Sequence, residues 1–262
     1  MVDSTTNRWE NLMEELWLSS KPHHHYNVDK AYALDRFNSG IELYRAIDSK
    51  FGLRGKKILD VGVGTGGVAC AFSKSSEVTG IDVDDNFIKI AKAQMGNRKK
   101  SFRLLKWDGV KIPFGDSSFD VVLCFDILEH VPDPDGLAKE IARVLKRNGL
   151  VFVTTENKWS PWFIIRDPHY GIPINVLLPR KVREFLVLRV FKLDNKLEDW
   201  HWFGSLGEVS NLFKKHGIDM ETFDDLKDRE FYKLKCNSYG IFSSLLKKIY
   251  KTMIIYGVGK KV

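Results

Sequence analysis

The stretch Leu59-Asp60-Val61-Gly62-Val63-Gly64-Thr65-Gly66-Gly67 decides how this chain folds. It ends the apolar run Lys57–Val61, which has the composition of a buried strand, and it leads into a helix-like stretch that runs to about Lys74. Glycines at such a strand-to-helix turn allow backbone N–H groups and the positive end of the helix to approach a ligand closely. The stretch therefore predicts a ligand-binding turn after the first strand of an α/β domain.

Around this turn, from about residue 56 to residue 157, short β-rich runs alternate with helix-like stretches. This alternation is typical of a parallel sheet with crossover helices. The expected strands are Lys57–Val61, Glu77–Asp82, Phe102–Trp107, Phe119–Phe125 and Leu150–Thr155. The expected helices are Thr65–Lys74, Asn86–Met95 and Pro134–Lys146, the last opened by Asp133-Pro134 and closed by Asn148-Gly149.

The regular alternation stops after the fifth strand. Residues 158–204 are rich in aromatic residues and prolines, a composition that favours a lid or binding element. A helix at Leu206–His216 and a strand at Ile218–Phe223 follow. An amphipathic helix at 241–251 then precedes an apolar run, Met253–Val258, which we expect to insert antiparallel beside the fifth strand.

These patterns predict a Rossmann-like α/β fold with helices on both faces of the sheet. The sheet should have seven strands, mostly parallel with an antiparallel last strand, and a helical and irregular lid insertion. Four parts are expected along the chain: a helical cap over 1–50 with helix-like stretches at Trp9–Leu18 and Val28–Lys50, a ligand-binding core over 51–157, the lid over 158–204, and the completion of the core over 205–262.

The glycine turn alone leaves two cofactor classes open. Gly62, Gly64 and Gly67 satisfy the dinucleotide fingerprint G-x-G-x-x-G. Asp82 ends the second strand, where an acid binds ribose hydroxyls in proteins of either class. Asp60 separates the two, because a carboxylate inside the motif suits a cationic amino group and would repel a pyrophosphate.

Further motifs follow in a specific order: D-x-G-x-G-x-G, then Gly80-Ile81-Asp82, Trp107-Asp108, Pro113-Phe114 with Ser118-Phe119-Asp120, and Leu128-Glu129-His130-Val131. In this order the chain resembles the class I S-adenosylmethionine-dependent methyltransferases. Within them it is similar to the small-molecule, type 11 branch that includes the ubiquinone-biosynthesis O-methyltransferases. The resemblance is close over about residues 50–160 and looser from Leu206 to Val262.

The resemblance implies S-adenosylmethionine as cofactor and S-adenosylhomocysteine as product. It implies cofactor contacts at the ends of four strands: Asp60, Gly62, Gly64 and Gly66 along the methionine and ribose, Asp82 on the ribose hydroxyls, Val83 on the adenine, Asp108 on the adenine amino group with Trp107 and Gly109 beside it, and Phe125 and Asp126 near the sulfonium. For Trp107 and Phe125, ordinary packing in the core is the alternative interpretation.

A hydroxyl acceptor benefits from a general base, because it must lose a proton as the methyl group arrives. The resemblance puts His130 beside the cleft, so His130 is the first candidate, and a structural helix-start histidine is the alternative. His169 and His201 in the lid are further candidates. Some relatives bind a divalent ion through an acid-x-x-Glu-His pattern, which Asp126, Glu129 and His130 match; neighbours on one tight turn need not converge on an ion, so we expect no metal.

The expected activity is methylation of a hydroxyl on a saccharide, lipid-linked or quinone-like small molecule. The alternatives are an RNA or protein methyltransferase, a non-catalytic module that binds S-adenosylmethionine, and a nicotinamide dehydrogenase. We do not expect a nucleic-acid partner, because no Asn-Pro-Pro-Tyr or Asp-Pro-Pro-Tyr follows the fourth strand. Basic residues among the lid aromatics would suit either a sugar or a single-stranded nucleic acid. They are Arg166, Arg180, Lys181 and Arg183.

The composition of the 262 residues bears on the partners and the cellular compartment of the protein. The net charge of +7 is compatible with anionic lipid, nucleic acid or a phosphorylated substrate. Three scattered cysteines, a polar start and no apolar run of membrane-spanning length favour the cytoplasm. The basic helix at 241–251 suits peripheral contact with an anionic membrane, with packing over the sheet as the alternative. The sequence sets no oligomeric state.

Overall fold

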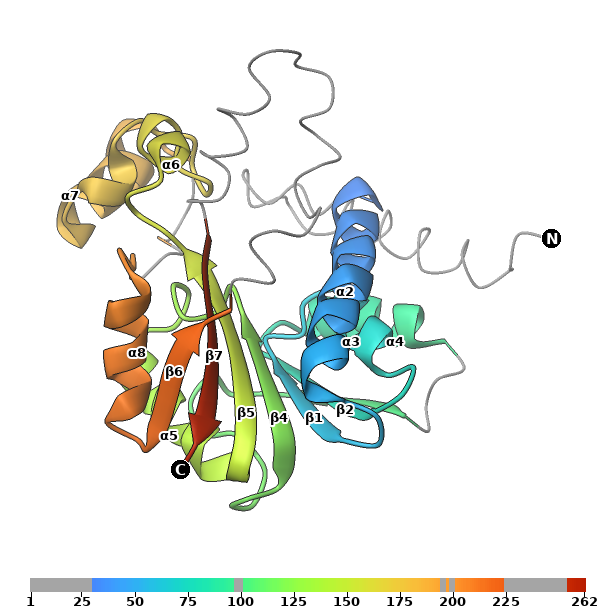
Figure 1. Cartoon of the computed structure of the whole chain (residues 1–262). Coiled ribbons are helices and arrows are strands. Elements are labelled where there is room, and N and C mark those ends of the chain that lie inside the picture. Colours follow the sequence, from blue (N-terminus) through green and yellow to red (C-terminus); the bar gives the residue numbers. More distant parts are fainter. Residues whose placement is uncertain (1–29, 97–100, 194–196, 198–200, 224–253) are drawn as a thin grey trace, which may run out of the picture.

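A computed structural model describes residues 30–96, 101–193, 197, 201–223 and 254–262, with residues 30–36 described by their backbone alone. A seven-stranded sheet of order β3-β2-β1-β4-β5-β7-β6 forms its centre (Figure 1). The strands are β1 (Lys57–Val61), β2 (Glu77–Asp82), β3 (Phe102–Lys106), β4 (Phe119–Phe125), β5 (Leu145–Glu156), β6 (Ile218–Thr222) and β7 (Ile254–Lys261). Neighbouring strands from β3 to β5 pair in parallel, whereas β7 runs antiparallel to both β5 and β6.

The two faces of the sheet carry different helices. One face is covered by α2 (Lys30–Phe51), α3 (Gly67–Phe72) and α4 (Asp85–Met95), and the other by α5 (Pro134–Val144) and α8 (Leu206–Lys214) (Figure 1). The short helices α6 (Pro161–Ile165), η1 (Asn175–Leu177), α7 (Arg180–Phe185) and η2 (Leu186–Val190) lie beyond the end of β5.

Alternation along the strands fills the two cores. On β1, Ile58 packs with α2 and α3, whereas Leu59 and Val61 pack with α5 and α8 on the opposite face. The backbone of α2 approaches α3 closely, because a Cβ atom on Gly40 would lie 2.7 Å from the Cα atom of Val68. Helix ends follow sequence signals: the side chains of Asp84, Asp133 and Ser205 accept hydrogen bonds from the N–H groups of Asn86, Gly136 and Glu208.

The predicted fold class is confirmed, including the antiparallel insertion of the last strand between β5 and β6. The predicted limits of β1, β2 and β4 are confirmed as well. The predicted end of α5 at Lys146 is wrong, and Asn148-Gly149 does not cap that helix. The helix ends at Val144 because Leu145 takes an extended conformation and pairs with Phe119 of β4.

Other limits shift by a few residues. Helix α3 begins at Gly67 rather than at Thr65, because Gly66 holds a left-handed conformation with φ 82°. Helix α8 ends at Lys214, and β7 runs from Ile254 to Lys261 rather than from Met253 to Val258. The predicted helices at 9–18 and 241–251 lie outside the described residues. The division of the chain into four parts stays a prediction.

Candidate active site

The glycine turn after β1 has the backbone that its sequence predicts. Gly62, Gly64 and Gly66 have φ angles of 71°, 53° and 82°, in the left-handed region that side chains disfavour. The N–H groups of Gly62 and Val63 donate to the carbonyl of Ile81 at 2.8 and 3.0 Å, which fixes the turn against β2. These hydrogen bonds hold the turn at the carboxyl ends of β1 and β2.

Asp82 links this turn to the end of β2. Its carboxylate accepts hydrogen bonds from the N–H of Gly64 at 2.8 Å and from the N–H of Asp84 at 2.9 Å. Burial raises the pKa of Asp82, and the same two hydrogen bonds oppose that rise. Asp60 is also buried, one residue before the end of β1. Two carboxyl groups thus flank the glycine turn.

The turn after β3 forms the next side of the site. Asp108 accepts hydrogen bonds from the N–H groups of Val110 and Lys111 at 2.8 and 3.0 Å, and these bonds lower its pKa. The Trp107 side chain is buried and donates from Nε1 to the carbonyl of Lys111 at 3.1 Å. Gly109, with φ 82°, lies so close to Val83 that a Cβ there would be 3.3 Å from the Val83 Cγ1 atom.

These surroundings fit an adenosyl group. Val83 and Val110 expose 53% and 74% of their surface, whereas most apolar side chains at the strand ends are buried. An exposed apolar pair beside two acidic turns matches a ligand that combines a flat base with ribose hydroxyls. The structure therefore brings together the predicted contacts Asp82, Val83, Asp108 and Gly109, whose roles toward the cofactor stay predictions.

The turn after β4 is strained and tied to β5. Asp126 has φ 56°, an uncommon conformation for a residue with a side chain. Its N–H donates to the carbonyl of Thr154 at 2.9 Å, and its carboxylate accepts from the Thr154 hydroxyl at 2.8 Å. Phe125, just before it, is buried in the core that faces α2 and α3. Its surroundings are those of an ordinary core residue, which is the alternative to a cofactor contact.

All three predicted histidines gather at this turn. The rings of His130 and His169 meet edge to face with centroids 5.0 Å apart. The backbone N–H of His201 donates to the carbonyl of Glu129 at 3.2 Å, and its Nε2 atom lies 3.2 Å from the carbonyl oxygen of Pro132. Residues that are up to 71 positions apart in the sequence therefore meet at the carboxyl ends of β4 and β5.

Two acids shape the electrostatics around these histidines. Glu129 is buried and accepts a hydrogen bond from the Thr155 hydroxyl at 3.0 Å. Burial first, and then the charges of Asp126 and Glu156, raise the pKa of Glu129 well above its usual range. Burial alone would lower the pKa of His169, but the neighbouring Glu156 carboxylate outweighs it and raises that pKa. The pKa values of Glu129 and His169 are thus both shifted in the direction that favours the protonated form.

Sequence reasoning missed Glu156 and the two threonines before it. Glu156 lies 3.0 Å from the Nε2 atom of His169, while Thr154 and Thr155 donate to Asp126 and Glu129. A signal was present, because an acid that directly follows a buried strand occupies the same kind of position as Asp82. Its partner could not be read from the sequence, since His169 comes from the segment after β5.

Within the part of the chain that the structure describes, no three His, Cys, Asp or Glu side chains are arranged to hold a metal ion. In the pattern Asp126, Glu129 and His130, the side chain of Glu129 is bonded to Thr155. Among the described helices, none is long and apolar enough to span a membrane.

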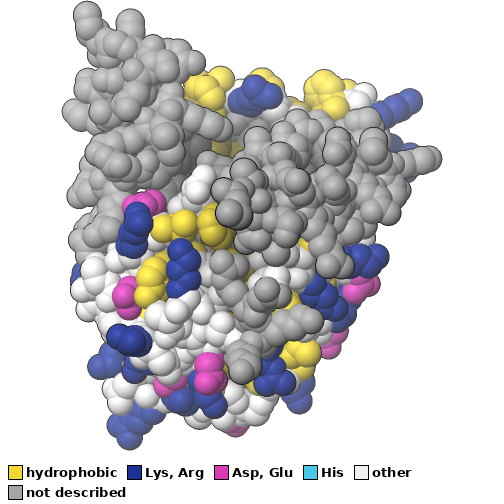
Figure 2. Space-filling view, turned by 90° about the vertical axis from the view of Figure 1, so that its right-hand side faces the viewer, with side chains coloured by type: hydrophobic (Ala, Val, Ile, Leu, Met, Phe, Trp, Pro, Cys, Tyr) yellow, Lys and Arg dark blue, Asp and Glu magenta, His cyan; other side chains and the backbone are white. Residues whose placement is uncertain are grey.

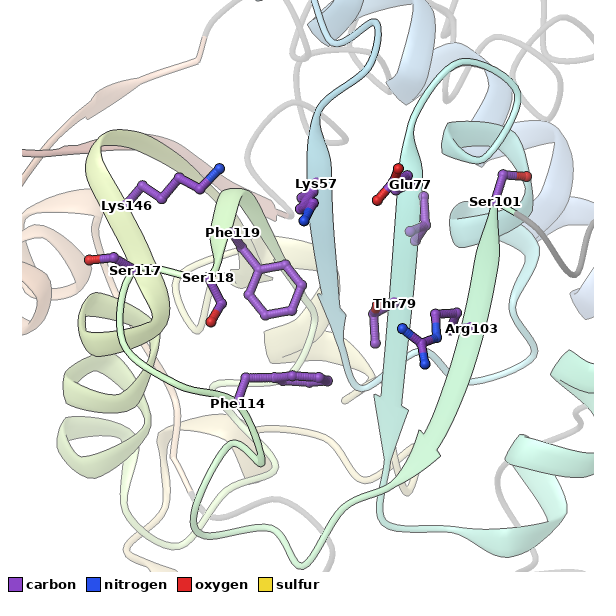
Figure 3. A pocket seen from close by; sticks show the side chains of 11 residues that line it. Lys57, Glu77, Thr79, Ser101, Arg103, Phe114, Ser117, Ser118, Phe119 and Lys146 are labelled. Carbon is purple, nitrogen blue, oxygen red and sulfur yellow. The ribbon is translucent and has the colours of Figure 1, made fainter.

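A cavity of about 420 Å³ lies elsewhere, at the amino ends of β1, β2 and β3 (Figure 3). Thr79 and Arg103 face it from neighbouring strands, and Phe114 and Phe119 form its aromatic side with ring centroids 5.0 Å apart (Figure 3). Because the glycine turn follows the carboxyl ends of the strands, this cavity is separate from the candidate active site.

Known proteins match the part of the chain that builds this site. Residues 59–153 match the family described as "Methyltransferase domain". A ubiquinone biosynthesis O-methyltransferase of Idiomarina loihiensis is 38% identical over 112 residues, which cover 41% of this chain and 45% of that protein. One from Paracidovorax citrulli is 35% identical over 146 residues, which cover 54% and 60%. The chain thus spans about half the length of the curated relatives it matches.

Solved structures share the fold over most of the chain. An S-adenosylmethionine-dependent methyltransferase from Mesorhizobium loti has a TM-score of 0.58 at 17% identity, covering 86% of this chain and all of that one. One from Aquifex aeolicus has a TM-score of 0.54 at 19% identity, covering 85% and 92%. Family match, relatives and fold agree with the motif order along the sequence. The family match over residues 59–153 and the shared fold therefore support a methyltransferase domain of class I fold in this part of the chain, with S-adenosylmethionine as its cofactor.

Proposed function

We propose that the protein transfers a methyl group from S-adenosylmethionine to a hydroxyl oxygen of a small-molecule acceptor. The observation that carries this proposal is the meeting of His130 with the His169–Glu156 pair at the sheet edge that also holds Asp82 and Asp126. A proton acceptor thereby stands next to the predicted cofactor contacts. The O-methyltransferases among the relatives support a hydroxyl as the acceptor group.

The bound cofactor supplies a methyl group on a cationic sulfonium. The protein's task is to align the acceptor oxygen with that methyl group and to take up the hydroxyl proton. As the carbon–oxygen bond forms and the carbon–sulfur bond breaks, the proton passes to His130. His169 is held by Glu156 and its pKa is raised, so it orients the cluster and is less suited to accept the proton.

Aromatic surroundings support an acceptor with a ring. The ring centroids of His169 and Trp202 are 5.4 Å apart, and Tyr170 lies beside them at 6.3 Å from His169. A quinone-like phenol agrees with the relatives, and a saccharide hydroxyl is the second acceptor to be tried. We place the protein in the cytoplasm, where the buried cysteines Cys70 and Cys124 stay thiols.

The test is a transfer assay with methyl-labelled S-adenosylmethionine and three acceptors: a catechol-type phenol, a reducing saccharide and a primary amine. We expect S-adenosylhomocysteine and a methyl ether in equal amounts, with the phenol as the better acceptor. Methyl transfer to the amine would contradict the assignment of an oxygen acceptor. Cofactor binding without transfer to any acceptor would favour a non-catalytic binding module.

A variant separates the role of the base from cofactor binding. His130→Gln should lower kcat by about 10²- to 10⁴-fold, the usual contribution of a general base. Its affinity for S-adenosylhomocysteine should stay within about twofold, because the imidazole is not among the predicted cofactor contacts. His216→Gln, in the turn after α8 and beside Asp135, serves as the matched control and should keep full activity.

A further inference from the structure

The segment 158–193 exposes an unusual amount of apolar surface. Among the described residues, thirteen large apolar side chains are exposed, and nine of them belong to this one segment. Their exposed fractions run from 42% to 67%. We call these nine residues the apolar rim: Trp159, Trp162, Ile165, Ile174, Leu177, Val182, Phe185, Val190 and Phe191.

The exposed side chains belong to a segment that has a buried core of its own. Tyr170, Ile172 and Val187 of this segment form a small core of their own together with Leu197. The N–H of Ile174 donates to the carbonyl of Ile164, which ties η1 to α6. The rim side chains thus face outward although apolar packing is available beneath them. Apolar side chains that are exposed in such number on one folded segment, beside its own buried core, mark a place where another surface is met.

The rim residues lie on the short helices α6, η1, α7 and η2 or directly beside them. Helices α6 and α7 lie together beyond the carboxyl end of β5 (Figure 1). Along the continuous turn of α7 and η2, Val182, Phe185 and Arg189 follow each other at helical spacing and are all exposed. Val187, between them in sequence, is fully buried. One face of this helical stretch therefore points outward and combines the apolar Val182 and Phe185 with the cation of Arg189.

Basic residues outnumber acidic residues in the same segment. Residues 158–193 contain seven lysines and arginines and two acidic residues. One of the acids, Asp167, is buried and accepts hydrogen bonds from the N–H groups of His169, Tyr170 and Ile172. Glu184 is thus the only exposed acid of the segment. On the face seen in Figure 2, by contrast, acidic side chains lie among the basic ones.

We propose that the apolar rim docks this protein onto an anionic lipid bilayer. Tryptophan, phenylalanine and aliphatic side chains mixed with lysine and arginine are typical of surfaces that rest in the headgroup region. The exposed cations Arg166, Lys181, Arg189 and Lys192 would face lipid phosphates and carboxylates. A second copy of the chain is a poor occupant, because it would bring two strongly basic segments together.

Docking goes beyond the proposed function and needs neither cofactor nor turnover. It would matter for the site, because His169 belongs to the docked segment and contacts His130 at 5.0 Å between ring centroids. A rim that rests in the bilayer would hold the acceptor side of the site at the lipid surface, within reach of a lipid-borne hydroxyl.

The test is sedimentation of the full chain with vesicles, without S-adenosylmethionine. Vesicles of phosphatidylcholine with phosphatidylglycerol should bind the protein, vesicles of phosphatidylcholine alone should bind it far less, and added salt should weaken the binding. The double variant Phe185→Ser/Phe191→Ser should lower the partition coefficient by about tenfold or more, since two exposed apolar anchors are lost. Lys181→Glu/Arg189→Glu should lower it by at least roughly fivefold per residue.

Matched controls lie at the other end of the sheet. Val262→Ser removes an apolar side chain that is 72% exposed, and Lys56→Glu reverses an exposed charge before β1; both should bind vesicles like the unchanged protein. Thermal unfolding and affinity for S-adenosylhomocysteine should be unchanged in the rim variants, which separates a docking defect from a failure of the proposed function.

Several results would overturn the proposal. Equal binding of both vesicle types would contradict docking onto anionic lipid. Unchanged binding by the rim variants would show that the rim does not contact the membrane. A dimer that is lost in Phe185→Ser/Phe191→Ser, without vesicle binding, would assign the rim to a second copy of the chain. Retention on polyglutamate without vesicle binding would assign it to an acidic protein partner.

Discussion

The Nε2 atom of His169 lies 3.0 Å from the Oε2 atom of Glu156, and this contact joins the segment after β5 to the last residue of β5. The side chains are 5% and 15% exposed, so solvent screens their interaction little. The centroid of the same imidazole ring lies 5.0 Å from that of His130 and 5.4 Å from that of the Trp202 ring. One ion pair thus fixes the acceptor side of the candidate active site.

This ion pair makes stability depend on pH. The pKa of His169 is raised in the folded protein by Glu156, so the stabilisation is complete below the unfolded value of about 6.5 and is lost as pH rises through the raised folded value. Glu156→Gln should lower the free energy of unfolding by about 1–3 kcal/mol at pH 6, and by less at pH 9. Urea unfolding at both pH values measures the difference.

The exposed acid Asp135 provides the control for that experiment. Asp135→Asn removes a surface partner of Lys215, and it should change the free energy of unfolding far less than Glu156→Gln at pH 6. A Glu156→Gln effect that stays constant from pH 6 to pH 9 would show that the charge on His169 does not contribute to folding.

Asp82 is expected to control cofactor affinity. Asp82→Asn keeps an acceptor for only one of the N–H groups of Gly64 and Asp84, which bond to different oxygens, and it removes the negative charge that would hold the ribose hydroxyls. The affinity for S-adenosylhomocysteine should fall by about 10- to 100-fold, since a hydrogen bond to a charged group contributes about 1.5–3 kcal/mol. Calorimetric titration checks this. Asp85→Asn, which breaks only the exposed pair with Lys106, should leave the affinity unchanged.

The sequence predicts the sheet well, because its strands carry strong local signals. Phe119–Phe125 contains the apolar run 121–125, and Glu77–Asp82 has β-branched residues between two acids; the limits of both strands agree with the structure. The glycine turn is equally local, since left-handed backbone at Gly62 and Gly66 demands glycine itself. The end of α5 was missed because pairing of Leu145 with Phe119 is a tertiary effect that local propensity does not contain.

The site could be predicted only in part, for a similar reason. Acids at strand ends, such as Asp82 and Asp108, follow from position in the alternation of strands and helices. The partnership of Glu156 with His169 depends on how the segment after β5 folds back, and no periodicity reports that. The exposure of residues such as Phe185 was likewise hidden, because an aromatic-rich sequence reads equally as core or as surface.

The close approach of the glycine turn to α4 predicts a cost at Gly66. A Cβ atom there would lie 2.8 Å from the Cβ atom of Ala91, and φ is 82°. Gly55 has a similar φ of 72° with nothing within 4 Å, so it isolates the backbone cost. Gly55→Ala should lower the free energy of unfolding by about 1–2 kcal/mol, and Gly66→Ala by a further 1–3 kcal/mol, roughly, from overpacking. If urea unfolding shows the same loss of free energy for Gly55→Ala and Gly66→Ala, α4 accommodates the added methyl group without a cost in stability.

We expect that lysine cannot replace Arg143 without a loss of stability. From α5 its guanidinium donates to the carbonyls of Phe114 and Ile112 at 2.8 and 3.0 Å, which holds the loop before β4. It also pairs with Glu140 and Asp116, and these acids raise its pKa above the ordinary value of a guanidinium.

A lysine at this position offers one compact ammonium in place of a planar fork of donors, so the contacts cannot all be kept. Because the Arg143 side chain is 23% exposed, solvent replaces part of what is lost, and Arg143→Lys should lower the free energy of unfolding by about 1–2 kcal/mol. Arg147→Lys, at an exposed position of β5, should change it by less than about 0.5 kcal/mol. If both variants unfold at the same urea concentration, the loop before β4 is held by the apolar packing of Phe114 against Phe119 and not by the guanidinium.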